Sequence, residues 1–243
     1  MRGGGYEVNE SQRTKTQTSQ QVITTAKYTE VRAQKTIIEI ISDQIEKGNA
    51  SCPDDDLLVY ETCLVFQSAL ATWSRLGVPH NCPGIDFEID KLSSNQKSLT
   101  KLSLSHINLA VDSPCFGHLF AVQVASSVPI LIGSATRSYA ENIGGFMNPG
   151  SNAELCLQSR LGFCGSQTAV ALSILNKAGF KARPVEFYWI SSGKRVNHIL
   201  PEVLIDGHYR LIDTTYSAYW VDPTADGFEL VPTEKVINKS KKN

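Results

Sequence analysis

The chain has 243 residues, of which 42% are hydrophobic and 19% are charged, and its formal net charge is −1. This balance is typical of a folded globular chain, and it excludes the strongly basic surface that nucleic acids and anionic membranes require. The longest apolar run, Leu119 to Gly133, is short for a bilayer and contains Gln and Ser, so we expect no membrane span. The polar N-terminal stretch lacks the apolar part of a signal peptide, which predicts a cytoplasmic protein.

Six cysteines are scattered along the chain: Cys52, Cys63, Cys82, Cys115, Cys156 and Cys164. An even number permits disulfides, but the wide spacing and the lack of a secretory signal favour thiols. There is no Cys-x-x-Cys pair, so we expect no structural zinc and no other metal. A regulatory disulfide between Cys156 and Cys164, eight residues apart, is left open.

The first 150 residues contain mostly helical patterns. Residues 1–30 are rich in Gln, Thr, Ser and Gly, which predicts a flexible polar arm, and residues 31–150 form a mostly helical N-terminal part. Within that part, "AQKTIIEIISDQIEKG" has helical spacing of isoleucines. A long helix, "LLVYETCLVFQSALATWSRLG", follows the acidic run Asp54–Asp56. "FGHLFAVQVASSVPILIG" predicts a buried segment and leaves its secondary structure undecided. "SATRSYAENIGGF" predicts a short helix.

Residues 151–243 show sharper signals and form the predicted core. Asn152 is a candidate helix cap, and "SQTAVALSILNKAGF" predicts a helix that stops at Gly179. Four strand candidates follow: "ARPVEFYWI", "RVNHILPEVLI", "HYRLIDTTY" and "FELVP". Asp206–Gly207 predicts a tight hairpin between the second and the third. A helix followed by an antiparallel meander predicts an α+β fold.

Three residues in this core have the chemistry of a thiol enzyme. Cys164 begins the predicted helix, where the unpaired N–H groups and the helix dipole favour a thiolate nucleophile. His198 lies on a downstream strand and Asp213 on the next, across the predicted hairpin. The alternation of side chains puts both on matching faces, so the imidazole can act as general base and acid while the carboxylate orients it.

The same stretch resembles a known family. "RLGFCGSQTAVALSILNKAGFKARPVEFY" and "NHILPEVLIDGHYRLIDTT" are similar to the two halves of the core of transglutaminase-like proteins, over about residues 158–231. The resemblance implies a papain-like fold, in which the nucleophile helix packs on an antiparallel sheet. It also implies a thioester on Cys164, a triad with His198 and Asp213, and no cofactor. Pro201 within the histidine strand departs from a regular ladder and predicts an edge position or a bulge there.

Further site residues carry weaker signals. Gln158 lies six residues before Cys164, where papain-like enzymes place an oxyanion-stabilising glutamine, and it could equally be helical surface. Tyr216, Tyr219 and Trp220 follow Asp213 closely, which suggests an aromatic wall that binds substrate, or plain packing.

Several neighbouring residues have two readings. Arg160 could anchor the loop before Cys164, although an ordinary surface arginine is slightly favoured. Glu202 could support His198 or lie exposed on its strand. The histidines His106, His118 and His208, like the five other cysteines, are expected to be non-catalytic.

The sequence thus predicts a cysteine-dependent amide hydrolase or acyltransferase. Its partners would be a substrate with an amide or thioester bond and, for transfer, an amine acceptor, with no nucleic acid. Two alternatives stay open: an acyltransferase that forms amide bonds during biosynthesis, and a transglutaminase-like binding or scaffold domain without catalysis.

Overall fold

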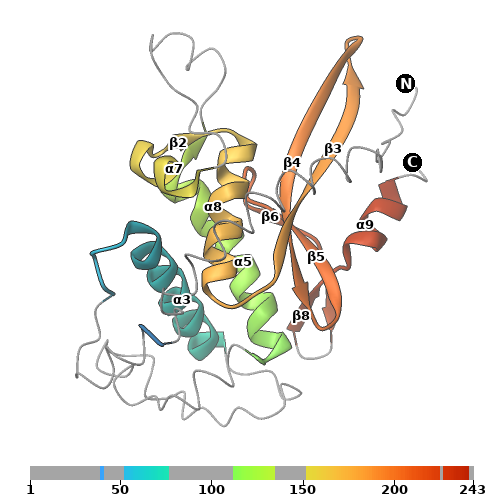
Figure 1. The fold of residues 1–243 in the computed structure, drawn as a ribbon. Helices are drawn as coiled ribbons and strands as arrows, with labels where there is room; N and C mark the ends of the chain where they lie inside the picture. The colour runs from blue at the N-terminus through green and yellow to red at the C-terminus, as the bar shows by residue number, and fades with distance from the viewer. Residues whose placement is uncertain (1–38, 41–51, 77–111, 135–151, 225–226, 241–243) are drawn as a thin grey trace.

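The structure, a computed structural model, describes residues 39–40, 52–76, 112–134, 152–224 and 227–240 (Figure 1). Its helices are α3 (Leu57–Leu76), α5 (Pro114–Leu131), α7 (Ala153–Ser159), α8 (Cys164–Lys177) and α9 (Thr233–Ser240). Its strands are β1 (Gly133–Ser134), β2 (Leu161–Gly162), β3 (Ala182–Ser191), β4 (Lys194–Ile205), β5 (His208–Asp213), β6 (Ala218–Tyr219), β7 (Val221–Thr224) and β8 (Gly227–Leu230). The predicted arm over residues 1–30 lies outside the described residues. So do the helix predicted from Ala33, apart from the helical Glu39 and Ile40, and nearly all of the short helix predicted from Ser134.

A mixed arrangement of helices and antiparallel strands confirms the predicted α+β class. Strands β3, β4, β5 and β6 form one antiparallel sheet in that order. All four strand candidates appear, as β3, β4, β5 and β8. Asp206 and Gly207 have φ values of 50° and 72°, as the two central residues of a tight hairpin turn require. The antiparallel meander after α8 is therefore local in sequence, which explains why the pattern predicted it.

The sheet has helices on both faces. In Figure 1, α3, α5, α7 and α8 lie on one side of the sheet and α9 on the other. The larger core joins α3, α5 and α8 to Val203, Ile205 and Ile212 of the sheet. The smaller core lies on the opposite face, where Val185, Leu200 and Leu211 pack with Phe187 and with Val236 of α9.

The buried segment whose secondary structure the sequence left undecided is helix α5. Its Phe116, Phe120 and Val124 are fully buried against the neighbouring helices. By length and composition α5 could also cross a membrane, contrary to the expectation that no segment could. A core helix passes the same test, and half of α5 is buried inside the protein.

Local capping signals fix the ends of several helices as expected. The Asp56 carboxylate accepts a hydrogen bond from the backbone N–H of Val59 at 3.0 Å, which caps α3. Asn152 caps α7 in the same way, through the N–H of Leu155 at 3.1 Å. Helix α8 ends before Gly179, whose φ of 95° suits only glycine, as the sequence predicted.

The prediction of scattered thiols is wrong for three cysteines. Cys52 and Cys63 form a disulfide that ties the segment before α3 to the middle of that helix. Cys115 is also disulfide-bonded. The sequence argument failed because spacing along the chain says nothing of how a helix folds back on its preceding segment. The expected cytoplasmic location stays a prediction.

Strand β4 loses its β5 partner at Pro201. The β4–β5 ladder runs only from Ile205 to Glu202, whereas β4 stays paired with β3 along its whole length. Pro184 and Pro201 are opposite each other in the β3–β4 pair. Neither has an N–H, so this is a non-hydrogen-bonded pair, and the Pro201 nitrogen is directed toward β5 with nothing to donate. The predicted irregularity at Pro201 is therefore an end of pairing, and it opens the β4 edge beyond it.

Candidate active site

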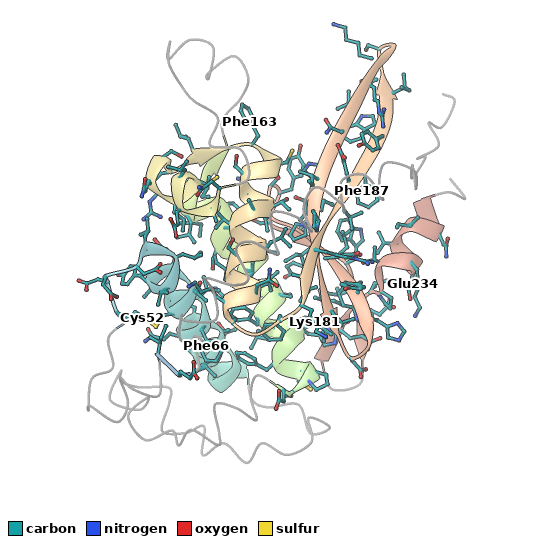
Figure 2. The ribbon with its side chains drawn as sticks, in the orientation of Figure 1. Cys52, Phe66, Phe163, Lys181, Phe187 and Glu234 are labelled. Atoms are coloured by element: carbon teal, nitrogen blue, oxygen red, sulfur yellow. A yellow bond between two sulfur atoms is a disulfide. The ribbon has the colours of Figure 1, made fainter. Side chains whose placement is uncertain are left out.

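Cys164 is the first residue of α8, and a tight packing contact holds it there. The preceding residue, Phe163, is the N-cap of α8, and its side chain lies at the start of this helix in Figure 2. A Cβ on Gly162 would lie 2.5 Å from the Cβ of Ser166, so only glycine fits at this approach. Gly162 therefore allows close contact with the first turn of α8.

His198 and Asp213 are joined across the sheet as the strand alternation predicted. Nε2 of His198 lies 3.0 Å from Oδ2 of Asp213. The other carboxylate oxygen of Asp213 accepts hydrogen bonds from the backbone N–H groups of Thr215 and Tyr216, at 2.8 and 3.1 Å. These backbone donors fix the carboxylate, and the carboxylate in turn fixes the plane of the imidazole.

The Cys164 thiol and the His198 ring form a coupled pair. The side-chain hydrogen bond from His198 is the main cause that lowers the pKa of Cys164, against the opposing effect of burial. The hydrogen bond to Asp213, followed by the one to Cys164, raises the pKa of His198 to about 9. Both shifts favour a thiolate beside an imidazolium. Since Nε2 faces Asp213, Nδ1 is the ring nitrogen left for the sulfur.

The open edge of β4 receives the start of α8. Ile199, next to His198, directs its backbone groups to the same side as Pro201, two residues on. Its N–H contributes a hydrogen bond that lowers the pKa of Cys164. Its carbonyl accepts a hydrogen bond from Oγ1 of Thr168 at 2.9 Å. The gap left by the end of the β4–β5 ladder is thus filled by Cys164 and Thr168, which joins the nucleophile helix to the histidine strand.

Arg160 anchors the loop before Cys164, so the slightly favoured reading of an ordinary surface arginine is wrong. Its Nη2 lies 2.9 Å from Oε1 of Glu61, a buried carboxylate on α3. Its backbone carbonyl accepts a hydrogen bond from Gly133 at 2.9 Å. Arg160 also has a φ of 54°, which turns the chain sharply between α7 and β2. The loop that leads to the nucleophile is therefore tied to α3 and to β1.

The three aromatic candidates lie in different places. The ring of Tyr216 is tilted beside the His198 ring, with centroids 5.6 Å apart, and its side chain is largely exposed. On β6, Ala218 is opposite Asp213 and Tyr219 is opposite Ile212. Ile212 faces the larger core, so the register puts Tyr219 on the face away from Asp213. Tyr216 of the predicted wall thus lies beside the triad. Tyr219 lies on the other face of the sheet, and Trp220 is exposed after β6.

Gln158 is exposed on α7, and the described residues show no hydrogen bond between it and Cys164. Its predicted role at an oxyanion stays a prediction. The backbone N–H of Cys164 belongs to the first turn of α8, where N–H groups lack partners within the helix. This position allows it to stabilise a developing oxyanion.

The remaining candidates have structural surroundings. Glu202 is buried and paired with Arg183, so the reading of an exposed carboxylate is wrong. His208 is exposed. The thiol of Cys156 is fully buried, and burial raises its pKa. Since Cys156 and Cys164 are both outside any disulfide, the regulatory bond is not formed here. In the part of the chain that the structure describes, no three His, Cys, Asp or Glu side chains gather as metal ligands.

Sequence reasoning missed the contacts that bring the triad together. Thr168 lies four residues after Cys164, hence on the same side of α8, and this spacing is a signal that could have indicated it. The backbone donors at Ile199, Thr215 and Tyr216 carry no side-chain signal. Glu61 is 99 residues from Arg160, and nothing local relates the two.

No protein-family model matches the chain, and no curated protein is significantly similar to it. The likeness to transglutaminase-like proteins therefore stays a prediction from the motifs around Cys164, His198 and Asp213.

Proposed function

We propose that this protein is a cysteine-dependent amide hydrolase or acyltransferase with a transglutaminase-like, papain-type catalytic core. One observation carries the proposal: Cys164, His198 and Asp213 are linked in series by hydrogen bonds, and the linkage lowers the pKa of the cysteine while it raises that of the histidine. A structural cysteine in an apolar core has the opposite shift, as Cys156 does in the same protein.

The first half of the reaction forms a thioester. The Cys164 thiolate attacks the carbonyl carbon of an amide or thioester, and the carbonyl oxygen becomes an oxyanion beside the Cys164 N–H. When the tetrahedral intermediate collapses, the carbon–nitrogen bond of an amide or the carbon–sulfur bond of a thioester breaks. The His198 imidazolium gives its proton to the leaving amine or thiol. Asp213 keeps the ring oriented throughout and stabilises its charged form.

The second half releases the acyl group. A water molecule or an amine attacks the thioester carbonyl and gives a proton to the now neutral His198. The carbon–sulfur bond then breaks, and the thiolate–imidazolium pair is restored. Water yields hydrolysis, whereas an amine yields acyl transfer. No step requires a metal or an organic cofactor, because the chain supplies nucleophile, base and acid.

Alkylation tests the proposal directly. Iodoacetamide at neutral pH is expected to modify Cys164 faster than Cys156, and mass spectrometry of proteolytic fragments reads out both sites. Cys156 is a thiol eight residues away with the opposite pKa shift, but it is also fully buried, so the pH midpoint of Cys164 labelling is the decisive measurement. Equal labelling of the two, or an ordinary thiol pKa for Cys164 near ~8.5, would favour a binding or scaffold domain without catalysis.

Substrate turnover separates the enzymatic outcomes. A Cys164→Ala variant is expected to lose all amide cleavage and to form no acyl–enzyme adduct. Product analysis with and without added primary amines then distinguishes a hydrolase from an acyltransferase that forms amide bonds.

A further inference from the structure

The β3–β4 hairpin has two chemically different faces along the part that projects beyond the helices (Figure 1). The register puts Phe187 opposite His198 and Trp189 opposite Val196. Residues directly opposite in an antiparallel pair lie on the same face, and so do residues two apart on one strand. Phe187, Trp189 and Val196 therefore share the face of His198, here called the histidine face.

The histidine face offers apolar surface that the fold does not fully use. Phe187 packs in part against the smaller core, at the place where Figure 2 labels it on the hairpin. Trp189 and Val196, farther toward the tip, are only partly buried. The face ends at Ser191 and Lys194, which are opposite each other. From Phe187 to His198 it carries no carboxylate, so it has no anionic side chain to pair with a cationic ligand.

The opposite face carries a polar cluster and, farther toward the tip, the exposed side chain of Ile190. The guanidinium of Arg195 lies 3.7 Å from the centroid of the Tyr188 ring. Glu186 accepts hydrogen bonds from the Tyr188 hydroxyl and from the amide of Asn197. These polar side chains satisfy one another, and Ile190 lies beyond them toward the tip. Phe187, Trp189 and Val196 therefore form the apolar surface on the side of the hairpin that carries His198.

We propose that the histidine face binds a large apolar side chain of an extended, peptide-like acyl donor, next to the carbonyl that Cys164 attacks. Two residues along a strand span about 7 Å, so Val196 lies one side-chain step from His198. A donor whose carbonyl sits at Cys164 therefore presents its nearest side chain to Val196 and Trp189. An apolar group there displaces water from both, whereas a small polar group gains little. The inference rests on the function proposed above and adds its substrate class.

Paired electrophiles test this preference. N-protected phenylalanine and serine chloromethyl ketones carry the same warhead and differ in the side chain, while iodoacetamide has none. Labelling rates at Cys164, measured by mass spectrometry, are expected to favour the phenylalanine reagent. Trp189→Ala is expected to reduce the ratio of the two ketone rates about tenfold, with the iodoacetamide rate unchanged. Val196→Thr, which keeps the shape of the side chain, is expected to reduce it in the same direction.

The hairpin supplies its own matched controls. Tyr188→Ala removes an aromatic ring from the residue before Trp189, but on the opposite face. Arg195→Gln removes a cation from the residue before Val196, also on the opposite face. Both are expected to keep the wild-type ratio. Equal ratios for the two ketones in the wild type would overturn the inference, and so would equal losses in Trp189→Ala and Tyr188→Ala. Failure of iodoacetamide to prefer Cys164 would instead overturn the proposed function, so the two failures are distinguishable. Thermal melting of each variant identifies any change that comes from a loss of folding. If Trp189→Ala does not fold, the ratio of the two ketone rates in Val196→Thr tests the inference.

Discussion

Thr168 donates a 2.9 Å hydrogen bond from its hydroxyl to the backbone carbonyl of Ile199, the residue after His198. The same Ile199 gives its N–H to the sulfur of Cys164. The backbone N–H and carbonyl of Ile199 are thereby both bonded to side chains on one face of α8. Because the ladder to β5 ends at Pro201, these two bonds take the place of strand pairing at the point where His198 must meet Cys164.

Thr168→Val should loosen this junction. Valine keeps the shape of threonine but leaves the Ile199 carbonyl without its donor, at a cost of about 1–2 kcal/mol in the free energy of unfolding. As the β4 edge moves away, the pKa of Cys164 should rise, so the midpoint of its alkylation should shift to higher pH. Thr168→Ser, which restores the hydroxyl, should return the midpoint toward wild type.

Thr62→Val is a matched control for this prediction. Thr62 is also buried and donates to the carbonyl of Leu58 at 2.7 Å, but within α3. The Leu58 carbonyl keeps its helical N–H donor, so the variant should lower stability less and leave the alkylation midpoint of Cys164 unchanged. An unchanged midpoint in Thr168→Val would show that the hydrogen bond supports the fold alone.

The Asp213–His198 bond should set the alkaline limit of activity. The pKa of His198 is raised to about 9, so the imidazolium persists through neutral pH and loses its proton above about 9. Proton donation to a leaving amine should therefore fall as pH rises through that value. The raised pKa also contributes stability that is fully present below the unfolded value of 6.5 and lost as pH rises through about 9.

Asp213→Asn should move this limit to lower pH. The amide removes the carboxylate that is the main cause of the raised pKa, so His198 should titrate nearer 6.5 and Cys164 should lose part of its thiolate at neutral pH. Proton NMR of the His198 ring and the pH profile of alkylation measure the two shifts. A His198 titration that stays near 9 in the variant would contradict the assigned role.

The Glu61–Arg160 pair should show an unequal response to the loss of either partner. Arg160→Leu leaves the Glu61 carboxylate buried without its cation, whereas Glu61→Gln leaves Arg160 half-exposed to water. We expect the first variant to lose about 2–3 kcal/mol of unfolding free energy and the second about half of that. Chemical denaturation of both variants and of the double variant forms a complete cycle. Equal costs, or additive costs in the double variant, would mean that the pair does not anchor the loop.

The sequence predicted those parts of the fold and of the site that depend on local pattern. The start of α8 at Cys164, the turn at Asp206–Gly207 and the alternation from His198 to Asp213 all follow from neighbours in the chain. The disulfide of Cys63 and the burial of Glu61 do not, because each depends on how α3 lies against other segments. Pro201 is predictable only in part. Its missing N–H predicted an irregular strand, but only the position of α8 explains which residues fill the gap beside β4.

His118 should govern stability in acid. This buried histidine on α5 accepts a hydrogen bond at Nδ1 from the N–H of Leu230 at 3.1 Å, which requires the neutral ring. Burial, and then the positive charge of Arg210, lower its pKa to about 4, while Asp206 acts in the opposite direction. Between pH 6.5 and about 4, His118 is therefore protonated in the unfolded chain and neutral in the folded chain. Stability should fall across that window by up to about 3 kcal/mol, from 1.36 kcal/mol for each of the roughly 2.5 pH units.

Replacing His118 separates its proton from its hydrogen bond. His118→Asn keeps an acceptor for Leu230 and cannot be protonated, so its unfolding free energy should change less between pH 6.5 and 4 than that of the wild type. His208→Asn, at an exposed histidine on β5 whose Nδ1 lies 3.5 Å from Oε1 of Glu234, removes a surface imidazole for comparison. Denaturant unfolding at several pH values measures all three proteins. If His118→Asn loses stability in acid as steeply as the wild type does, another group sets the acid limit.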